Sequence, residues 1–149
     1  MIAAQMVLLT LALTALCPAL EQDTDIAITD AWVRESTATR TASSGYFTIE
    51  NRTDKPVTLI TLSVAGVGDA QLHTMVDRQG QASMQPLEKL QIPPHASVDL
   101  APGGIHVMMS DITRPLKVGS TVDLTLTFDG GRTRTVRAVV RPLSAISAR

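Results

Sequence analysis

Cysteine is almost absent from this sequence. The single one, Cys17, directly follows the apolar run from Met6 to Leu16 near the N-terminus. If residues 1–19 are removed as a signal peptide, the mature chain has no cysteine. Disulfide bonds, thiolate metal sites and cysteine nucleophiles are then excluded together.

Long hydrophobic runs are also lacking. The stretch from Met6 to Leu16 is too short to span a bilayer, which takes about 20 apolar residues, but it suits the core of a signal peptide. The small residues Cys17 and Ala19 would permit cleavage after Ala19, so we expect an exported protein with no membrane span in its mature form. The alternative is a lipid anchor on Cys17, although Leu16 is larger than the residue that usually precedes such a cysteine.

Neither sign of charge is in excess. The 13 basic and 14 acidic residues give a net charge of -1, which creates no broad field for nucleic acid or for anionic lipid. Partners of those two classes are therefore not expected. The 149 residues suffice for one domain with a hydrophobic core.

No long stretch shows the period of a helix, whereas short β-rich segments alternate with turn signals. This pattern predicts an all-β sandwich or barrel, a single domain over residues 20–149 with its core at about 26–141 and a tail that frays from Leu143. The predicted strands are Ile26 to Val33, Tyr46 to Glu50, Val57 to Val64, Gln71 to Val76, Ala82 to Leu87, Ser97 to Leu100, His106 to Met109, Thr121 to Phe128 and Thr133 to Val140.

Two hairpins are predicted from turn residues. Asp129-Gly130 favours a type I′ turn, after which residues 133–140 return antiparallel. Asp77 and Gly80 suit the first and fourth positions of a β-turn. A simple hairpin about that turn pairs His73 with Met84, and a bulge at Gly80 would shift the pairing by one residue.

Beyond the signal segment, every methionine and histidine lies between residues 73 and 109. Residues two apart in a strand share a face, so His106 and Met108 can address one point while Met109 points the other way. His73 and Met75 are related in the same manner.

Two imidazoles and two thioethers form a neutral, soft donor set. Thioethers favour a soft monovalent ion such as Cu(I), or Ag(I), over Zn(II) or Mg(II). A blue-copper electron-transfer site needs a cysteine thiolate, so that function is excluded for the mature chain.

The spacing of His73, Met84, His106 and Met108, with intervals of ten, twenty-one and one residues, resembles that of the periplasmic copper(I) chaperones known as PCuAC. The segments DAWVRES, SGYFTIEN, QLHTMVDRQGQASMQPLE and LAPGGIHVMMSDITRPLKVGSTVDLTLTF resemble the same family. The resemblance implies a cupredoxin-like Greek-key fold, a periplasmic location and these four residues as Cu(I) ligands. It further implies delivery to the copper-site subunit of cytochrome c oxidase or to a thioredoxin-like copper assembly factor.

One departure from the family concerns the C-terminus. Some members carry a His- and Met-rich extension linked to Cu(II), whereas this chain ends RPLSAISAR. Cu(II) binding by a tail is therefore not expected.

The remaining candidates have simpler interpretations. Met109 is expected in the core, His95 in an exposed loop, and Trp32 as a core anchor of the first strand, with shielding of the metal as its alternative. No nucleophile motif supports an enzyme, and His95 with Asp99 makes no convincing acid/base pair. We expect a monomer. The alternative function is an exported structural or adhesion β-sandwich without a metal.

Overall fold

The computed structural model describes residues 25–146 of the chain. The predicted signal peptide, residues 1–19, lies outside this part. Within it, no helix is long and apolar enough to cross a lipid bilayer.

The protein is built from strands, as the alternating sequence predicted, with one short 3-10 turn, η1 (Asp129–Gly131), between the last two. The strands are β1 (Ile26–Arg34), β2 (Ser43–Asn51), β3 (Val57–Val64), β4 (Val67–Arg78), β5 (Gln81–Pro86), β6 (Leu90–Ile92), β7 (Ser97–Leu100), β8 (His106–Ile112), β9 (Thr121–Phe128) and β10 (Thr133–Arg141).

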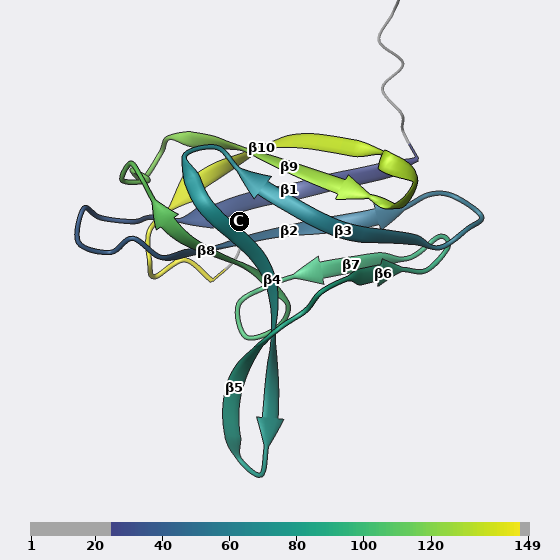
Figure 1. The fold of residues 1–149 in the computed structure, drawn as a ribbon, viewed down its shortest axis with the longest axis horizontal. Helices are drawn as coiled ribbons and strands as arrows, with labels where there is room; N and C mark the ends of the chain where they lie inside the picture. The colour runs from purple at the N-terminus through teal and green to yellow at the C-terminus, as the bar shows by residue number, and fades with distance from the viewer. Residues whose placement is uncertain (1–24, 147–149) are drawn as a thin grey trace, which may run out of the picture.

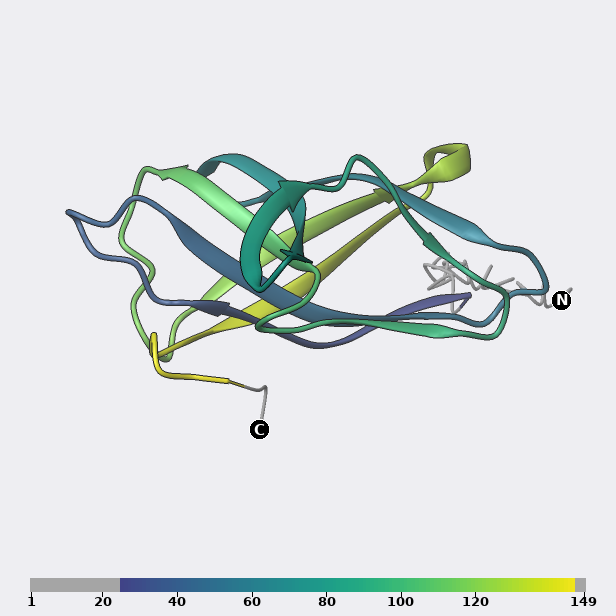
Figure 2. The same cartoon turned by 90° about the horizontal axis from the view of Figure 1, so that it is seen from below.

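The strands form one continuous sheet in the order β5-β4-β8-β2-β1-β10-β9-β3-β6, and β7 pairs with β2. The sheet folds into a flattened sandwich, from which the hairpin of β4 and β5 protrudes (Figure 1). Figure 2 shows the sandwich from below, with the C-terminal segment running along its outside. The site described below lies where the protruding hairpin meets β8.

The core follows from the alternation along the strands. In β9 the side chains of Val122, Leu124, Leu126 and Phe128 are buried, while the residues between them face outward. They join buried residues from the other strands in one apolar cluster, which includes Phe47 and Val107. This cluster holds β2 and β8 in place.

Two sequence predictions on local structure are wrong. The β9–β10 hairpin is antiparallel as predicted, but its loop is not a two-residue type I′ turn, because η1 occupies it and the N–H of Phe128 donates to the carbonyl of Arg132 at 2.8 Å. Strand β6 falls within residues 88–96, where no strand was predicted. Its three residues are too few to show a period.

Trp32 is buried, at 3% exposure, but it does not belong to the main core. Its neighbour Val33 points into that core, so Trp32 lies on the opposite face of β1, where its ring packs on Tyr46 at 4.4 Å between centroids. Its burial confirms the expectation of a core residue, although Trp32 packs on Tyr46 outside the main apolar cluster.

Part of the tail for which fraying was predicted is tied to β1 and the residue after it. The N–H of Leu143 donates to the Glu35 carboxylate at 3.1 Å, and the Arg34 guanidinium donates to the carbonyl of Ala145 at 3.1 Å. The segment therefore lies against the outer face of the sheet.

Candidate metal centre

The pairing of β4 with β8 brings the two predicted histidine ligands together. His73 lies directly opposite His106 in the antiparallel register, and their ring centroids are 6.0 Å apart at a tilt of 58°. Directly opposed residues project from the same face of a sheet. The two imidazoles, which are distant in the chain, thus face one region.

The β4–β5 hairpin has a different register from the predicted one. Met84 pairs with Met75, and His73 pairs with Pro86 rather than with Met84. The cause is a tighter turn, since only Gln79 and Gly80 separate the paired residues Arg78 and Gln81. The difference is two residues, and a shift by an even number keeps side chains on the same face. Met84 therefore remains on the face that carries His73.

The same face continues across β8. Met108 pairs with Gln71 on one side and with Ser44 of β2 on the other. Met108 and Met84 line one cavity of about 370 Å³, although they belong to strands separated in the sheet by β4. The rest of its lining consists of Arg34, Arg40, Ala42, Ser43, Ser44 and Leu143.

Exposure differs among the four candidate residues. His106 is 5% exposed and Met84 is 52% exposed, while His73 and Met108 lie between these extremes. The four side chains thus range from a buried imidazole, that of His106, to an accessible thioether, that of Met84 on the protruding hairpin.

A hydrogen bond orients His106. Its Nδ1 lies 3.0 Å from the carbonyl oxygen of Gly104. Since a carbonyl can only accept, Nδ1 carries the proton in the neutral ring, and Nε2 keeps its lone pair for another partner. Metal-ligating histidines are commonly fixed in this way.

His73 shows the opposite situation. Its Nδ1 is buried and has no hydrogen-bond partner. Buried polar atoms almost always have a partner, so an unpaired imidazole nitrogen beside a second imidazole fits a metal ligand.

The other sulfur and imidazole groups lie elsewhere or remain unassigned. Met109 is fully buried in the core, which confirms that prediction. His95 lies in an exposed turn, with Nε2 2.7 Å from Asp54 Oδ1, as predicted for a loop residue. Met75 shares the face of Met84, directly across the hairpin.

In the described part of the chain, no three His, Cys, Asp or Glu side chains form a group that could hold a metal. Any metal at this face would depend on thioethers in addition to the two imidazoles. Such donors select a soft ion.

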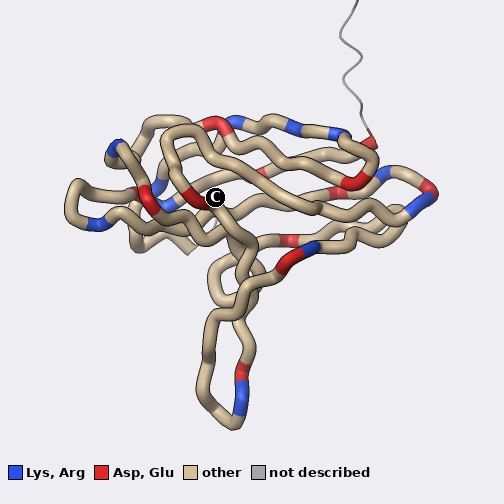
Figure 3. The backbone as a smooth tube through the Cα atoms, viewed as in Figure 1, with Lys and Arg blue, Asp and Glu red and all other residues tan. Residues whose placement is uncertain are grey.

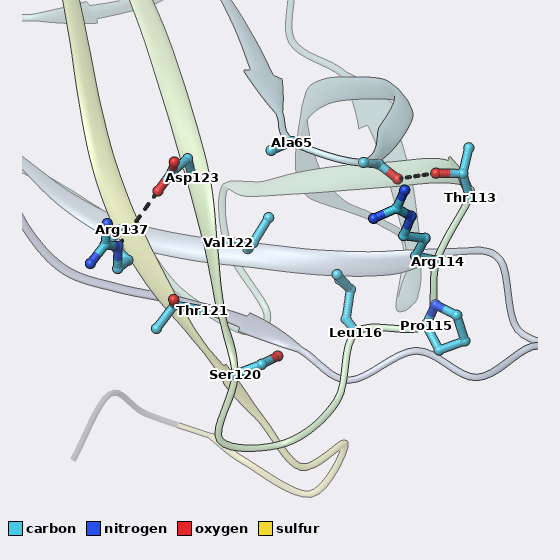
Figure 4. Close-up of a pocket in the computed structure, with 11 residues that line it drawn as sticks. Ala65, Thr113, Arg114, Pro115, Leu116, Ser120, Thr121, Val122, Asp123 and Arg137 are labelled. Carbon is cyan, nitrogen blue, oxygen red and sulfur yellow. Dashed lines mark hydrogen bonds and ion pairs between the residues drawn. The ribbon is translucent and has the colours of Figure 1, made fainter.

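A second cavity, of about 630 Å³, is formed by other elements (Figure 4). It is lined by residues of the β3–β4 turn, the β8–β9 connection, β9 and β10, and it includes the Arg137–Asp123 ion pair at 3.7 Å. It contains no histidine, cysteine or methionine. It therefore lacks the thioethers that line the first cavity.

Residues 26–140 match the model of a family described as "Putative lipoprotein LpqE-like". The chain belongs to this family. One relative is "Putative lipoprotein Lxx21020" of Leifsonia xyli subsp. xyli. It is 28% identical over 125 residues, which are 83% of this chain and 74% of the relative. An uncharacterized protein of Rickettsia prowazekii, RP573, is 28% identical over 99 residues, and the chain spans 55% of its length.

Two solved structures similar to this LpqE-like chain are copper-bound forms. The copper-bound PCuAC domain from PmoF2 is 28% identical, with a TM-score of 0.67 over 79% of this chain and 93% of that domain. The Cu(I) form of DR1885 from Deinococcus radiodurans is 32% identical, with a TM-score of 0.63 over 80% of this chain and 78% of the other. These matches confirm the predicted PCuAC resemblance and the cupredoxin-like β-sandwich.

Proposed function

We propose that this LpqE-like protein binds one Cu(I) ion through His73, Met84, His106 and Met108 and transfers it to another protein. The observation that carries the proposal is the sheet register, which sets His73 against His106 and leaves Met84 and Met108 on the same face, lining one cavity. Copper is bound in the similar PmoF2 and DR1885 structures, which supports the same cargo here.

The donor set suits transfer rather than storage. Four neutral ligands leave the charge of Cu(I) uncompensated, so the ion is held by soft-donor bonds and not by ion pairing. Met84, half exposed on the hairpin, would be the first ligand that a partner replaces. His106, buried and fixed by Gly104, would be the last. No catalytic turnover is part of the proposal.

Location and recipient belong to the same proposal. We infer export to the periplasm and delivery to the copper-site subunit of cytochrome c oxidase or to a thioredoxin-like copper assembly factor, with the protein acting as a monomer. The lipoprotein names of the family and of the Leifsonia relative support export. They also favour a lipid anchor on Cys17 over cleavage after Ala19, and mass spectrometry of the mature protein distinguishes the two.

Titration of the mature protein with Cu(I) against a competing chelator tests the ligand assignment. Met84→Leu and Met108→Leu keep apolar volume but remove the sulfur, so each is expected to weaken Cu(I) binding about tenfold or more. His95→Gln, which changes a histidine outside the site, serves as the control and is expected to bind as the wild type does.

Unchanged affinity in both methionine variants would contradict the assignment. Absence of stoichiometric copper, with no rise of the melting temperature on adding Cu(I), would instead support the metal-free structural β-sandwich.

A further inference from the structure

Positive charge lies next to the thioethers of the candidate metal centre. Arg34 and Arg40 line the same cavity as Met84 and Met108, and no acidic residue does. Arg40 is exposed in the loop between β1 and β2, and Arg34 is half-buried at the end of β1. Two guanidinium groups thus border the place where a partner would meet Met84.

A third arginine adds to this charge. Arg141 pairs with Arg34 in the parallel register of β10 and β1, so the two side chains project from the same face. Placing like charges on directly paired residues is unfavourable. In the described part of the chain, none of these three arginines forms an ion pair with a carboxylate.

The carboxylates of Glu35 and Asp69 accept hydrogen bonds from neutral groups. Glu35 accepts the N–H of Leu143. Asp69, which shares the face of Met108, accepts hydrogen bonds from Gln71 at 3.0 Å and from Ser110 at 3.4 Å. Neither carboxylate forms an ion pair with Arg34, Arg40 or Arg141, so these guanidinium groups can pair with a carboxylate from outside.

Arg34 is held in position by neutral groups only. Its guanidinium lies 5.5 Å from the ring centre of Tyr46 and donates to the carbonyl of Ala145. Neither contact neutralises its charge, and a guanidinium that is already oriented loses little entropy on meeting a carboxylate.

We propose that the surface formed by Arg34, Arg40 and Arg141, the arginine surface, receives carboxylate side chains of the protein that accepts copper. This inference rests on the proposed function. The protein as a whole carries a net charge of -1, so attraction of an acidic partner is local to this face and orients the encounter.

Copper loading strengthens the same attraction. The proposed ligands are neutral, so bound Cu(I) adds one positive charge beside the arginine surface. The β4–β5 hairpin adds little charge of its own, since Figure 3 shows it in tan, the colour of residues other than Lys, Arg, Asp and Glu, except near its tip. An acidic partner would therefore bind the loaded protein more tightly than the empty one and dissociate more easily after transfer.

Two synthetic dithiol peptides with identical cysteine spacing test this proposal. One has Asp and Glu beside its cysteines and the other has Asn and Gln at the same positions. The rate of Cu(I) transfer to each is measured by the ultraviolet absorbance of the Cu(I)-thiolate product. We expect the acidic peptide to be loaded about threefold faster or more at low ionic strength, and the advantage to disappear in high salt.

Arg40→Glu is the test variant, because its side chain is exposed and the substitution leaves the core intact. Lys55→Glu is the matched control, since Lys55 is an exposed residue in the loop at the opposite end of β2. Arg40→Glu is expected to abolish the advantage of the acidic peptide, while Lys55→Glu retains it. Equal rates for the two peptides with the wild type, or equal effects of the two variants, would overturn the proposal.

A separate measurement distinguishes this inference from the proposed function. If chelator competition shows that the wild type binds no Cu(I), the proposed function fails, and binding of each peptide to the metal-free protein is followed by NMR. Shifts of the Arg40, Ser43 and Ser44 amides with the acidic peptide alone would support the arginine surface. Shifts elsewhere, or none, would reject it.

Discussion

His106 is oriented by a backbone group only two residues away. Its Nδ1 donates to the carbonyl of Gly104 at 3.0 Å, and the ring is almost fully buried. Burial without this bond would leave one nitrogen unsatisfied and the tautomer undefined. With it, the second nitrogen, Nε2, is the one that can face His73 or a metal ion.

The first prediction follows from that bond. In the metal-free protein, long-range proton–nitrogen NMR spectra of the neutral ring should show the proton of His106 on Nδ1. Adding Ag(I), a stable substitute for Cu(I), should shift the resonance of Nε2 and leave Nδ1 protonated. His95, on the exposed turn, is the internal control and should not respond.

A proton on Nε2 in the metal-free protein, or a metal-induced shift at Nδ1, would contradict this orientation. Either result would also mean that the Gly104 carbonyl does not fix the tautomer of His106.

Neighbouring methionines show what strand alternation alone can predict. Met108 and Met109 were predicted to point to opposite faces, with Met109 in the core, and the structure confirms both the alternation and the burial of Met109. The arginines beside Met108 were not predicted. Arg34 and Arg40 are distant from Met108 in the chain, and no spacing pattern links them to it.

At the level of elements, the β4–β5 hairpin fixes the position of Met84. Gln79 and Gly80 both have positive φ, at 58° and 83°, the signature of a type I′ turn. The sequence suggested a wider turn, because Asp77 and Gly80 fit its first and last positions. The Asp77 carboxylate does accept the N–H of Gly80 at 2.8 Å, but inside the tighter hairpin.

The second prediction concerns this turn. Gly80→Ala places a side chain at a φ of 83°, where nothing lies within 4 Å of the new atom, so the cost is backbone strain of about 1–2 kcal/mol rather than a clash. Amide hydrogen exchange in residues 75–84 should become faster, and Cu(I) affinity should fall because Met84 is held less firmly.

Gln79→Asn should act in the opposite direction, because Asn-Gly is a preferred type I′ pair. Exchange in the hairpin should slow, with little change in the core amides of β9. If both variants changed amide exchange in β9 as much as in the hairpin, the hairpin would not open independently of the rest of the sheet.

At the level of the whole molecule, Asn51 joins the end of β2 to two other segments. Its side chain is 0% exposed. The Nδ2 group donates to the carbonyls of Lys55, Ile92 and Pro93 at 2.8, 3.1 and 3.0 Å. Its Oδ1 accepts from the N–H and hydroxyl of Thr53 at 3.0 and 2.8 Å. The loop after β2 and the end of β6 are thereby connected.

The third prediction separates stability from metal binding. Asn51→Ala leaves several buried polar groups without partners, so the free energy of unfolding in urea should fall by about 2 kcal/mol or more. The Cu(I) affinity of the folded protein should not change, because Asn51 lies at the far end of β2 from Ser44, which neighbours Met108. A parallel loss of affinity would show that the site depends on the whole sandwich.

The sequence by itself determined the all-β class, most strand positions, the soft donor set and the opposite faces of Met108 and Met109. These depend on side-chain chemistry and on a two-residue period, and both are local. Only the tertiary structure decided that His73 faces His106, that Met84 pairs with Met75, that Trp32 lies outside the main apolar cluster and that two arginines border the thioethers. Each of these depends on which strands become neighbours and in which register, and that is set by packing between segments far apart in the chain.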